Sequence, residues 1–274
     1  MAVNILCVVV LYKMQLNRSA SFLSLYRQVG DCDATVDFFI YDNSPLADVG
    51  LSEFPDIHYF HCPGNTGLGA AYNAAARYAE EKGFDWVLLL DQDTVLPDNF
   101  LQSYVKAIQE NPGIQVFAPR VSLSGKSLLS PMKRWRKQAT HLVAEKTYPI
   151  RQYLVINSGL CVKTSLFMQS GGYDEKVWLD FADMQFIRKL LHVGVRCFYL
   201  LSCECMQHFS NLETDPEKLK QRFDIYIACA RNCEYYDMAD WIFRQYCVLS
   251  HTIGLTIRTR SVYFLKCFFT RYLF

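Results

Sequence analysis

Short β-rich runs alternate with helix-like stretches through the first half of the chain, and this alternation constrains the fold more than any other feature. The β-rich runs are ILCVVVLY, VDFFIYDNS, IHYFHCPG, WVLLL and IQVFAP. Between them the sequence predicts a small-residue helix over residues 68–82 and a second helix over residues 98–109. Because apolar strands separated by helices are typical of a sheet buried on both faces, we predict an α/β fold with a mainly parallel sheet flanked by helices.

The pattern changes in the second half of the chain. Residues 122–152 are polar, basic and without a clear period, which predicts a long loop of the kind that carries function in compact enzymes. Order returns with YLVINSGLCV, with helices predicted near residues 165–170 and 183–192, and with the strand VRCFYLL. We therefore predict an α/β domain over residues 1–210 and a helical C-terminal extension over residues 211–274.

The C-terminal extension has a composition of its own. From Trp241 onward the last 34 residues contain Lys and Arg but no Asp or Glu, and they are dense in Trp, Phe, Tyr, Ile and Leu. A basic, aromatic and amphipathic tail fits attachment to an anionic membrane surface. A helix packed on the core with its basic face in water explains the same residues, and the sequence leaves both interpretations open.

Charge and cysteine usage exclude several classes of protein. A formal net charge of +1 argues against a nucleic-acid binder, which usually shows a strong basic excess. The 11 cysteines include no CxxC pair, so we expect buried thiols in a reducing compartment rather than zinc or disulfide sites.

The apolar run near the start of the chain is far shorter than the about 20 residues that span a bilayer. We expect a cytoplasmic protein with no transmembrane segment.

Two carboxylates, Asp91 and Asp93, follow the apolar run WVLLL directly. Ligands of open α/β sheets bind beyond the carboxyl ends of the strands, where Asp42 also follows FFIY. Carboxylate oxygens suit Mg²⁺ or Mn²⁺. A calcium-binding hand is excluded because the next positions lack the third oxygen ligand and the glycine that such a loop requires. An aspartate turn that precedes the helix beginning near Asp98 remains an alternative interpretation.

A glycine-rich loop precedes the small-residue helix. In PGNTGLGAAYN, Gly64, Gly67 and Gly69 would let the backbone and the helix N-terminus come close to a phosphate or a sugar. The spacing differs from the dinucleotide-binding pattern GxGxxG. A tight turn without a ligand therefore explains the loop equally well.

Taken together, the motifs resemble the family 2 glycosyltransferases of GT-A fold, most closely their rhamnosyltransferase branch, which builds bacterial surface polysaccharides. The resemblance rests on VVVLYK, YDNS, GNTGLGAAYN, WVLLLDQDTVLP, INSGLCV, GGYDE and WLDFADMQF. These motifs have the family's order and spacing over about residues 5–210. The resemblance implies a GT-A fold and a nucleotide-sugar donor.

The resemblance also implies which residues bind the donor. Asp42 corresponds to the aspartate that binds the nucleotide base, and the NSG segment lines the site of the donor sugar and the acceptor. The implied nucleotide-sugar site consists of Tyr12, Lys13, Asp42, Asn65, Gly67, Asn73, Asp91, Asn157, Ser158 and Gly159. Lys13 replaces a common asparagine of the family, which leaves the identity of the donor open.

A metal site and a general base follow from the same resemblance. Asp91 and Asp93 correspond to the family's DxD pair, and His208 corresponds to a histidine that completes the metal site in many members. A bound Mg²⁺ or Mn²⁺ would neutralise the departing diphosphate. Asp183 corresponds to the general base, with Asp180 as its partner, which implies a single displacement with inversion. A helix N-terminal cap is the alternative role for Asp183.

These inferences predict a metal-dependent inverting glycosyltransferase that uses dTDP-rhamnose or a UDP-hexose. The expected acceptor is a lipid-linked saccharide in O-antigen or capsule synthesis, at the inner face of the cytoplasmic membrane. The basic run KRWRK over residues 133–137 is a candidate contact for a phosphate-bearing acceptor or a solvated loop. Two alternatives are a catalytically inactive nucleotide-sugar-binding protein and a nucleotidyltransferase that forms sugar nucleotides. The complete set of acids argues against the first, and the late position of the glycines argues against the second.

Overall fold

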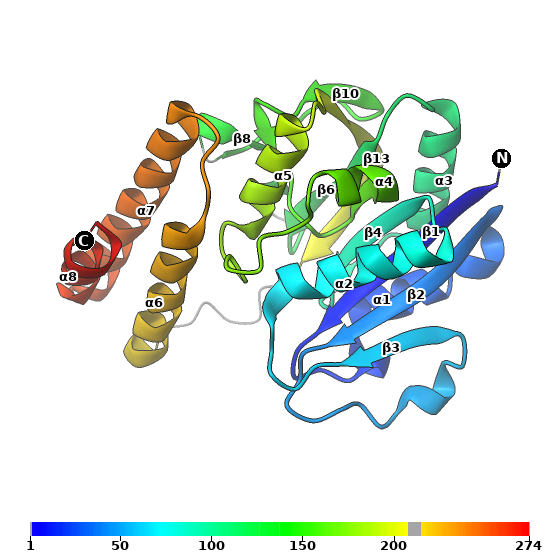
Figure 1. Ribbon diagram of the computed structural model, residues 1–274, viewed down its shortest axis with the longest axis horizontal. Helices are drawn as coiled ribbons and strands as arrows, with labels where there is room; N and C mark the ends of the chain where they lie inside the picture. Colours follow the sequence, from blue (N-terminus) through cyan, green and yellow to red (C-terminus); the bar gives the residue numbers. More distant parts are fainter. Residues whose placement is uncertain (1, 126, 137, 208–214, 274) are drawn as a thin grey trace.

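A ten-stranded sheet forms the centre of the computed structural model, which describes all residues except 1, 126, 137, 208–214 and 274. Its main path runs β10-β13-β6-β12-β4-β1-β2-β3. The first four strands pair in parallel, as predicted, and they are β1 (Val3–Leu11), β2 (Ala34–Asp42), β3 (Ile57–His61) and β4 (Trp86–Asp91). Their apolar sequences are explained by burial, since helices cover both faces of the sheet (Figure 1).

Two layers of helices enclose the sheet. On one face lie α2 (Gly67–Lys82), α4 (Thr164–Gln169) and α5 (Ala182–His192), and on the other lie α1 (Ala20–Tyr26) and α3 (Phe100–Glu110). Four alanines of α2, Ala71, Ala75, Ala76 and Ala79, fall on one helical face and are fully buried, so the helix can lie close against the strands. The α/β class and four of these helices, α2, α3, α4 and α5, confirm the prediction from the sequence, with boundaries that differ by one or two residues, whereas α1 was not predicted.

The second half of the sheet is mixed. β6 (Val116–Leu123) pairs in parallel with β13 (Cys197–Gln207), whereas β12 (Leu160–Lys163) runs antiparallel between β4 and β6. Two further antiparallel strands pair with β13, namely β5 (Thr94–Val95) and β10 (Lys146–Pro149). The NSG segment thus immediately precedes a strand that lies directly beside β4.

The prediction of a long unstructured loop over residues 122–152 is wrong. The segment contains β7 (Ser127–Ser130), β8 (Met132–Lys133) and β9 (Gln138–Ala139), and it ends in β10. β8 and β9 form a small sheet with β11 (Tyr153–Leu154). Strands of two to four residues are too short to produce a periodic pattern, which explains why the sequence did not reveal them.

The C-terminal helices pack against one another and against α5, at the end of the molecule away from β3 (Figure 1). They are α6 (Pro216–Asn232), α7 (Met238–Thr259) and α8 (Tyr263–Cys267), followed by a π-helical turn over Phe268–Tyr272. Asp215 and Asp237 cap α6 and α7 by accepting backbone N–H bonds. The predicted domain boundary between residues 210 and 211 lies outside the described residues and stays a prediction.

The structure also bears on the predictions about cysteines and membranes. All 11 cysteines lie in the described part of the chain, where none forms a disulfide and most are buried, which agrees with the expectation of buried thiols. Within the described part of the chain, no helix combines the length and the apolar character needed to cross a bilayer.

Candidate functional site

The carboxyl ends of β2 and β4 meet at one edge of the sheet. In the strand register Leu11 pairs with Asp42 and Val10 pairs with Asp91, so both aspartates flank the end of β1. Ligands of such sheets bind beyond this edge. The shared edge predicted for Asp42 and Asp91 is confirmed.

Asp91 accepts hydrogen bonds from three side chains. Its Oδ2 accepts from Ser158 Oγ and from Gln207 Nε2, the latter at 3.0 Å, and its Oδ1 accepts from Tyr72 Oη at 3.4 Å. Gln207 also donates to Ser158 Oγ, at 2.6 Å. These contacts come from α2, from the NSG segment and from the end of β13, so three distant parts of the chain fix one carboxylate.

Asp91 lies in surroundings that disfavour its negative charge. Burial raises the pKa of the Asp91 carboxyl and nearby Asp93 raises it further, while the hydrogen bonds from Ser158, Tyr72 and Gln207 lower it. Two neighbouring carboxylates with hard oxygens fit a divalent cation, which would relieve their repulsion. Among the described residues no cluster of three His, Cys, Asp or Glu could hold a metal ion. The predicted third ligand, His208, lies outside the described residues.

Asp183 lies at the start of α5 and is connected to the same segment as Asp91. Asn157 Nδ2 donates to Asp183 Oδ1 at 2.5 Å, and Asn157 Oδ1 accepts from the Tyr173 hydroxyl. Consecutive residues, Asn157 and Ser158, therefore hold the two acids. Burial and the charge of Asp91 raise the pKa of Asp183 to about 7, with Asp180 adding to the rise and the Asn157 hydrogen bonds opposing it.

Asp180, which the sequence predicts to assist Asp183, is held in an ion pair by the C-terminal extension. Asp180 forms a two-pronged ion pair with Arg222 of α6, in which Arg222 Nη2 donates to Asp180 Oδ1 at 2.8 Å. Between Asp180 and Asp183, Phe181 adopts a left-handed backbone conformation with φ 68° and packs on the ring of Tyr226, also of α6, at 4.9 Å. The C-terminal extension thus holds the turn that carries Asp183.

At the predicted nucleotide end, Asp42 and Asn43 connect β2 to the glycine-rich loop. Asp42 is almost fully buried and accepts from the Tyr59 hydroxyl at 2.6 Å and from Ser44 N at 2.8 Å. Asn43 accepts from Thr66 N and donates to Gly67 O, which fixes the loop that leads into α2. These bonds give Asp42 and Asn43 a structural role, and the predicted contact of Asp42 with a base stays a prediction.

Tyr12 and Lys13 form the rim beside this end. Tyr12 is 42% exposed, its backbone N–H donates to Gln92 Oε1 at 2.8 Å, and Lys13 Nζ lies 5.1 Å from the centre of its ring. Lys13 has a left-handed backbone, with φ 54°, and its N–H donates to Ser44 Oγ. Both residues therefore lie at the edge where Asp42 ends β2, and their predicted contacts with the ribose and base stay predictions.

Gly67 is required by a contact within the protein. Its φ is +88°, and a Cβ at this position would lie 2.6 Å from Trp178 Cβ and 2.8 Å from Trp178 O. Leu68 N also donates to Trp178 O. Asn65, with φ 46°, turns the chain into this contact. The loop expected to approach a phosphate therefore packs against the segment that leads to Asp180.

Asn73 is bonded to the GGYDE turn. Its Oδ1 accepts from Tyr173 N at 2.8 Å, and its Nδ2 donates to Tyr173 O and to Glu175 Oε1. Gly159 is likewise required by packing, because a Cβ there would lie 2.6 Å from Pro119 Cγ. The structure places both residues as supports, and the donor contacts implied for them stay predictions.

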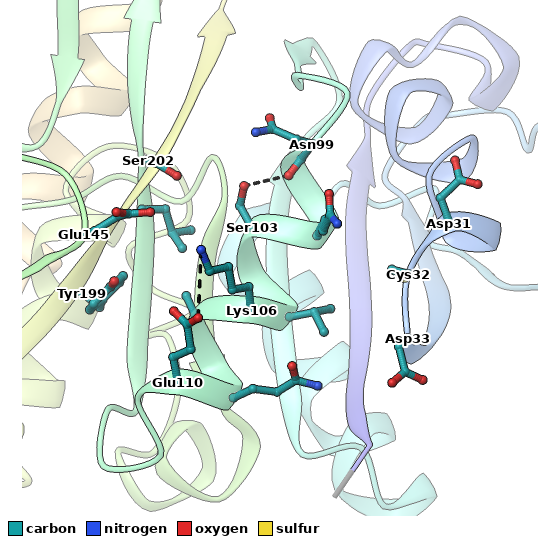
Figure 2. A pocket seen from close by; sticks show the side chains of 15 residues that line it. Asp31, Cys32, Asp33, Asn99, Ser103, Lys106, Glu110, Glu145, Tyr199 and Ser202 are labelled. Carbon is teal, nitrogen blue, oxygen red and sulfur yellow. Dashed lines mark hydrogen bonds and ion pairs between the residues drawn. The ribbon is translucent and has the colours of Figure 1, made fainter.

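Two cavities differ in their relation to these acids. A cavity of about 600 Å³ lies along α3, between Asp31, Asp33 and Glu145, and it contains none of the predicted site residues (Figure 2). A second cavity, of about 370 Å³, is lined by Asp180 and Asp183. The chemistry of the acids, rather than size, identifies the second cavity as part of the candidate site.

Four residues of the site were missed in the sequence. Tyr72 and Gln207 bond to Asp91, Tyr173 bonds to Asn157, and Arg222 pairs with Asp180. Tyr72 and Tyr173 stand inside the motifs GNTGLGAAYN and GGYDE, so a reading of every polar residue in those motifs would have included them. Arg222 carries no motif, because only the tertiary packing of α6 brings it to Asp180.

Comparison with known proteins identifies related sequences. Residues 36–168 match the family model described as glycosyl transferase family 2. The dTDP-rhamnosyl transferase RfbF of Shigella flexneri is 25% identical over 196 residues, which are 70% of this chain and 64% of that protein. The chain thus spans just under two thirds of the length of this relative.

Comparison with solved structures identifies the same architecture. S. aureus TarS 1-349 superposes with a TM-score of 0.53 at 15% identity, covering 86% of this chain and 68% of TarS. Its complexes with UDP and with UDP-GlcNAc give TM-scores of 0.56 and 0.54 at 14% identity, with 86% of this chain and 68% and 69% of TarS covered. Together with the family match, the superposition confirms the α/β GT-A fold.

Proposed function

Since the chain belongs to the family 2 glycosyltransferases, we propose that it transfers a sugar from a nucleotide-activated donor to a saccharide hydroxyl with inversion at the anomeric carbon. One observation carries the proposal: consecutive residues, Asn157 and Ser158, hold Asp183 and Asp91. A transferase of this kind needs charge neutralisation at the leaving group and a base at the acceptor hydroxyl. The geometry brings a candidate for each function to one segment.

Asp183 acts as the general base. A general base works best when its pKa lies near the operating pH, and the pKa of Asp183, raised to about 7, meets this condition. Asn157 orients the carboxylate through its Nδ2, and Tyr173 fixes Asn157 in turn. The carboxylate accepts the proton of the attacking hydroxyl as the new glycosidic bond forms, which is the role of the base in a single displacement.

Asp91 and Asp93 would hold Mg²⁺ or Mn²⁺, with His208 as the third predicted ligand. Such a cation would neutralise the negative charge on the leaving diphosphate. Ser158 and Gln207 fix the side chain of Asp91 through hydrogen bonds. Binding of the donor therefore costs little conformational entropy at this side chain.

The donor is dTDP-rhamnose or a UDP-hexose. The similarity to a dTDP-rhamnosyl transferase supports the first, and the similarity of the fold to a protein solved with UDP and UDP-GlcNAc supports the second. The candidates for the nucleoside end are Asp42, which lies across β1 from Asp91, and Tyr12 and Lys13, which directly follow β1.

Release of nucleoside diphosphate from a panel of nucleotide sugars, with Mg²⁺ or Mn²⁺, tests the activity. Asp183→Asn is expected to lower the rate by about 10²–10⁴-fold, the usual contribution of a general base. Asp91→Asn and Asp93→Asn are expected to abolish the increase in rate that Mg²⁺ or Mn²⁺ produces. Asp98→Asn, an exposed residue of the same loop, is the matched control and should keep the wild-type rate. Pyrophosphate release instead would contradict the proposal and favour a nucleotidyltransferase.

The acceptor is a lipid-linked saccharide at the inner face of the cytoplasmic membrane, in the synthesis of O-antigen or capsule. Support comes from the outer face of α7, where six apolar side chains are 42–72% exposed at spacings of three and four residues: Met238, Ile242, Tyr246, Leu249, Ile253 and Ile257. We call them the α7 stripe. Val248 and Leu255, on the opposite face of the helix, are buried in the C-terminal cluster. An apolar stripe next to a segment rich in Arg and Lys suits an anionic bilayer surface.

Flotation with vesicles that contain anionic phosphatidylglycerol tests the membrane contact. The double substitution Leu249→Gln, Ile253→Gln is expected to reduce the floating fraction several-fold, because it removes apolar area from the middle of the stripe. The matched control is Leu46→Gln, Val49→Gln, which changes two exposed apolar residues, 83% and 89% exposed, elsewhere on the surface. Equal flotation of both variants and the wild type would reject the α7 stripe as the membrane contact.

A further inference from the structure

We infer that the cavity beside Asp183 binds an apolar group of the acceptor, so that the acceptor is a saccharide whose reacting hydroxyl lies next to an aliphatic group. This inference rests on the proposed function and names the class of acceptor. The cavity, of about 370 Å³, is within the size range of small-ligand sites. We call it the acceptor cavity.

The acceptor cavity lies on the opposite side of Asp183 from the nucleotide end. Across the sheet the order is β2 with Asp42, then β1, then β4 with Asp91, then β12, which follows Asn157. Asp183 contacts Asn157 and also lines the cavity. A donor that extends from Asp42 past Asp91 would therefore place its anomeric carbon before Asp183, with the acceptor cavity beyond.

The C-terminal helices close the acceptor cavity. Tyr226 comes from α6, and Phe243 and Cys247 come from α7. Segments of the α/β domain complete the lining, and they contribute Met132, Leu154, Val155, Ile156, Leu179, Phe181 and Met184. The C-terminal extension is thus a wall of the candidate active site.

The chemistry of this lining selects against a fully hydroxylated sugar. Its surface is predominantly apolar, and its carboxylates are Asp183 and Asp180, of which Asp180 is paired with Arg222. A buried hydroxyl that finds no hydrogen-bond partner is strongly disfavoured, whereas an aliphatic group gains by leaving water. An aliphatic aglycone or the methyl group of a deoxy sugar would satisfy the same lining.

Binding of three small probes by calorimetry tests the inference without any need for turnover. The probes are n-octyl β-D-glucopyranoside below its micelle concentration, methyl β-D-glucopyranoside and methyl α-L-rhamnopyranoside. The octyl glycoside or the rhamnoside is expected to bind roughly tenfold or more tightly than methyl glucoside, the discrimination that a few apolar carbons commonly provide. Preference for the octyl chain identifies an aglycone, and preference for the rhamnoside identifies a deoxy sugar.

Substitutions on α7 locate the binding. Cys247→Trp fills the acceptor cavity and should abolish the preference, and the smaller Cys247→Leu should reduce it. Gly254→Trp is the matched control, because Gly254 lies two turns further along nearly the same face of α7 and an added Cβ there meets no atom within 4 Å. Far-ultraviolet circular dichroism, measured in parallel, reports whether each variant is folded.

Equal binding of all three probes by the wild type would overturn the inference, as would an unchanged preference in a folded Cys247→Trp protein. Failure of every nucleotide sugar to release a diphosphate would count against the proposed function alone, because probe binding does not depend on a donor. The two failures are therefore distinguishable.

Discussion

At the scale of single residues, the environment of Asp183 sets its acidity. Burial and the nearby charge of Asp91 raise its pKa, Asp180 raises it further, and Asn157 opposes the rise. Arg222 pairs with Asp180 from α6 and so offsets part of the charge of Asp180. Asp183, the proposed base, is thus close to two other acids, and Arg222 of the C-terminal extension counteracts the charge of one of them.

This arrangement predicts opposite shifts in the pH dependence of diphosphate release. A base must be ionised, so the rate should fall as the pH drops through about 7, the pKa of Asp183. Asp180→Asn removes a negative charge and should move this acidic limb to lower pH. Arg222→Gln exposes the charge of Asp180 and should move the limb to higher pH. Rate profiles over pH 5–9 measure both shifts. If the acidic limb moved in the same direction in both variants, the Asp180–Arg222 pair would not control the pKa of Asp183.

The residues of the site differ in how far the sequence revealed them. Asp42, Asp91 and Asp183 stand at strand or helix ends inside recognisable motifs, so their common edge could be predicted. Gly67 and Asn73 stand in equally clear motifs. In the structure, however, Gly67 packs against Trp178 and Asn73 bonds to Tyr173, both about 100 residues later in the chain. Motif spacing reports which residues are constrained, but it does not tell a contact with ligand from a contact within the protein.

At the scale of elements, the contact between the start of α2 and the segment before α5 requires glycine at position 67, because this residue has no Cβ. Gly67→Ala places a Cβ against Trp178 and requires alanine at φ +88°, so it should lower the free energy of unfolding by about 1–3 kcal/mol. Gly64→Ala is the control, because a Cβ there meets nothing within 4 Å. Urea unfolding compares the two. A Gly67→Ala protein as stable as Gly64→Ala would show that the junction can relax.

The elements that the sequence predicted well are the long and strongly patterned ones. β1 and β4 are buried along most of their length and α2 buries one of its faces, so their residues carry a clear signal. β8 and β9 have two residues each and are held by the surrounding tertiary structure, which leaves no local pattern to detect.

At the scale of the whole molecule, a buried charge network joins α7 to the α/β domain. Asp240, 8% exposed, pairs with Arg134 of the segment after β8 and with Arg188 of α5, whose Nε lies 2.7 Å from Asp240 Oδ1. Arg134 is part of the basic run that we considered as a contact for phosphate. Its position in this network gives it a structural role instead.

Asp240→Asn should therefore destabilise the protein strongly, by about 3–5 kcal/mol, because it leaves the buried guanidinium of Arg134 without its counter-charge and leaves Arg188 with Asp237 alone. The control is Glu217→Gln, which removes an exposed ion pair with Lys220 and should change stability by less than about 1 kcal/mol. Thermal unfolding measures both. A small effect of Asp240→Asn would indicate that α7 is joined to the domain mainly by apolar packing.

The composition of the C-terminal extension left two interpretations open; the structure confirms that α7 packs on the core, and attachment to a membrane stays a prediction. The inner face of α7 packs on the domain through Phe243 and Cys247, while the α7 stripe on its outer face stays exposed. Composition averages the two faces of a helix, so it could not assign each face to its environment.

The contact between Gly67 and Trp178 has a kinetic consequence. Trp178 lies two residues before Asp180, so a displacement of the N-terminus of α2 would reach the turn that carries Asp183, the proposed base. A nucleotide settling against that N-terminus would thereby adjust the opposite end of the site before a second substrate arrives. Such a linkage favours a compulsory sequence of addition, with the activated sugar entering first and the receiving alcohol second.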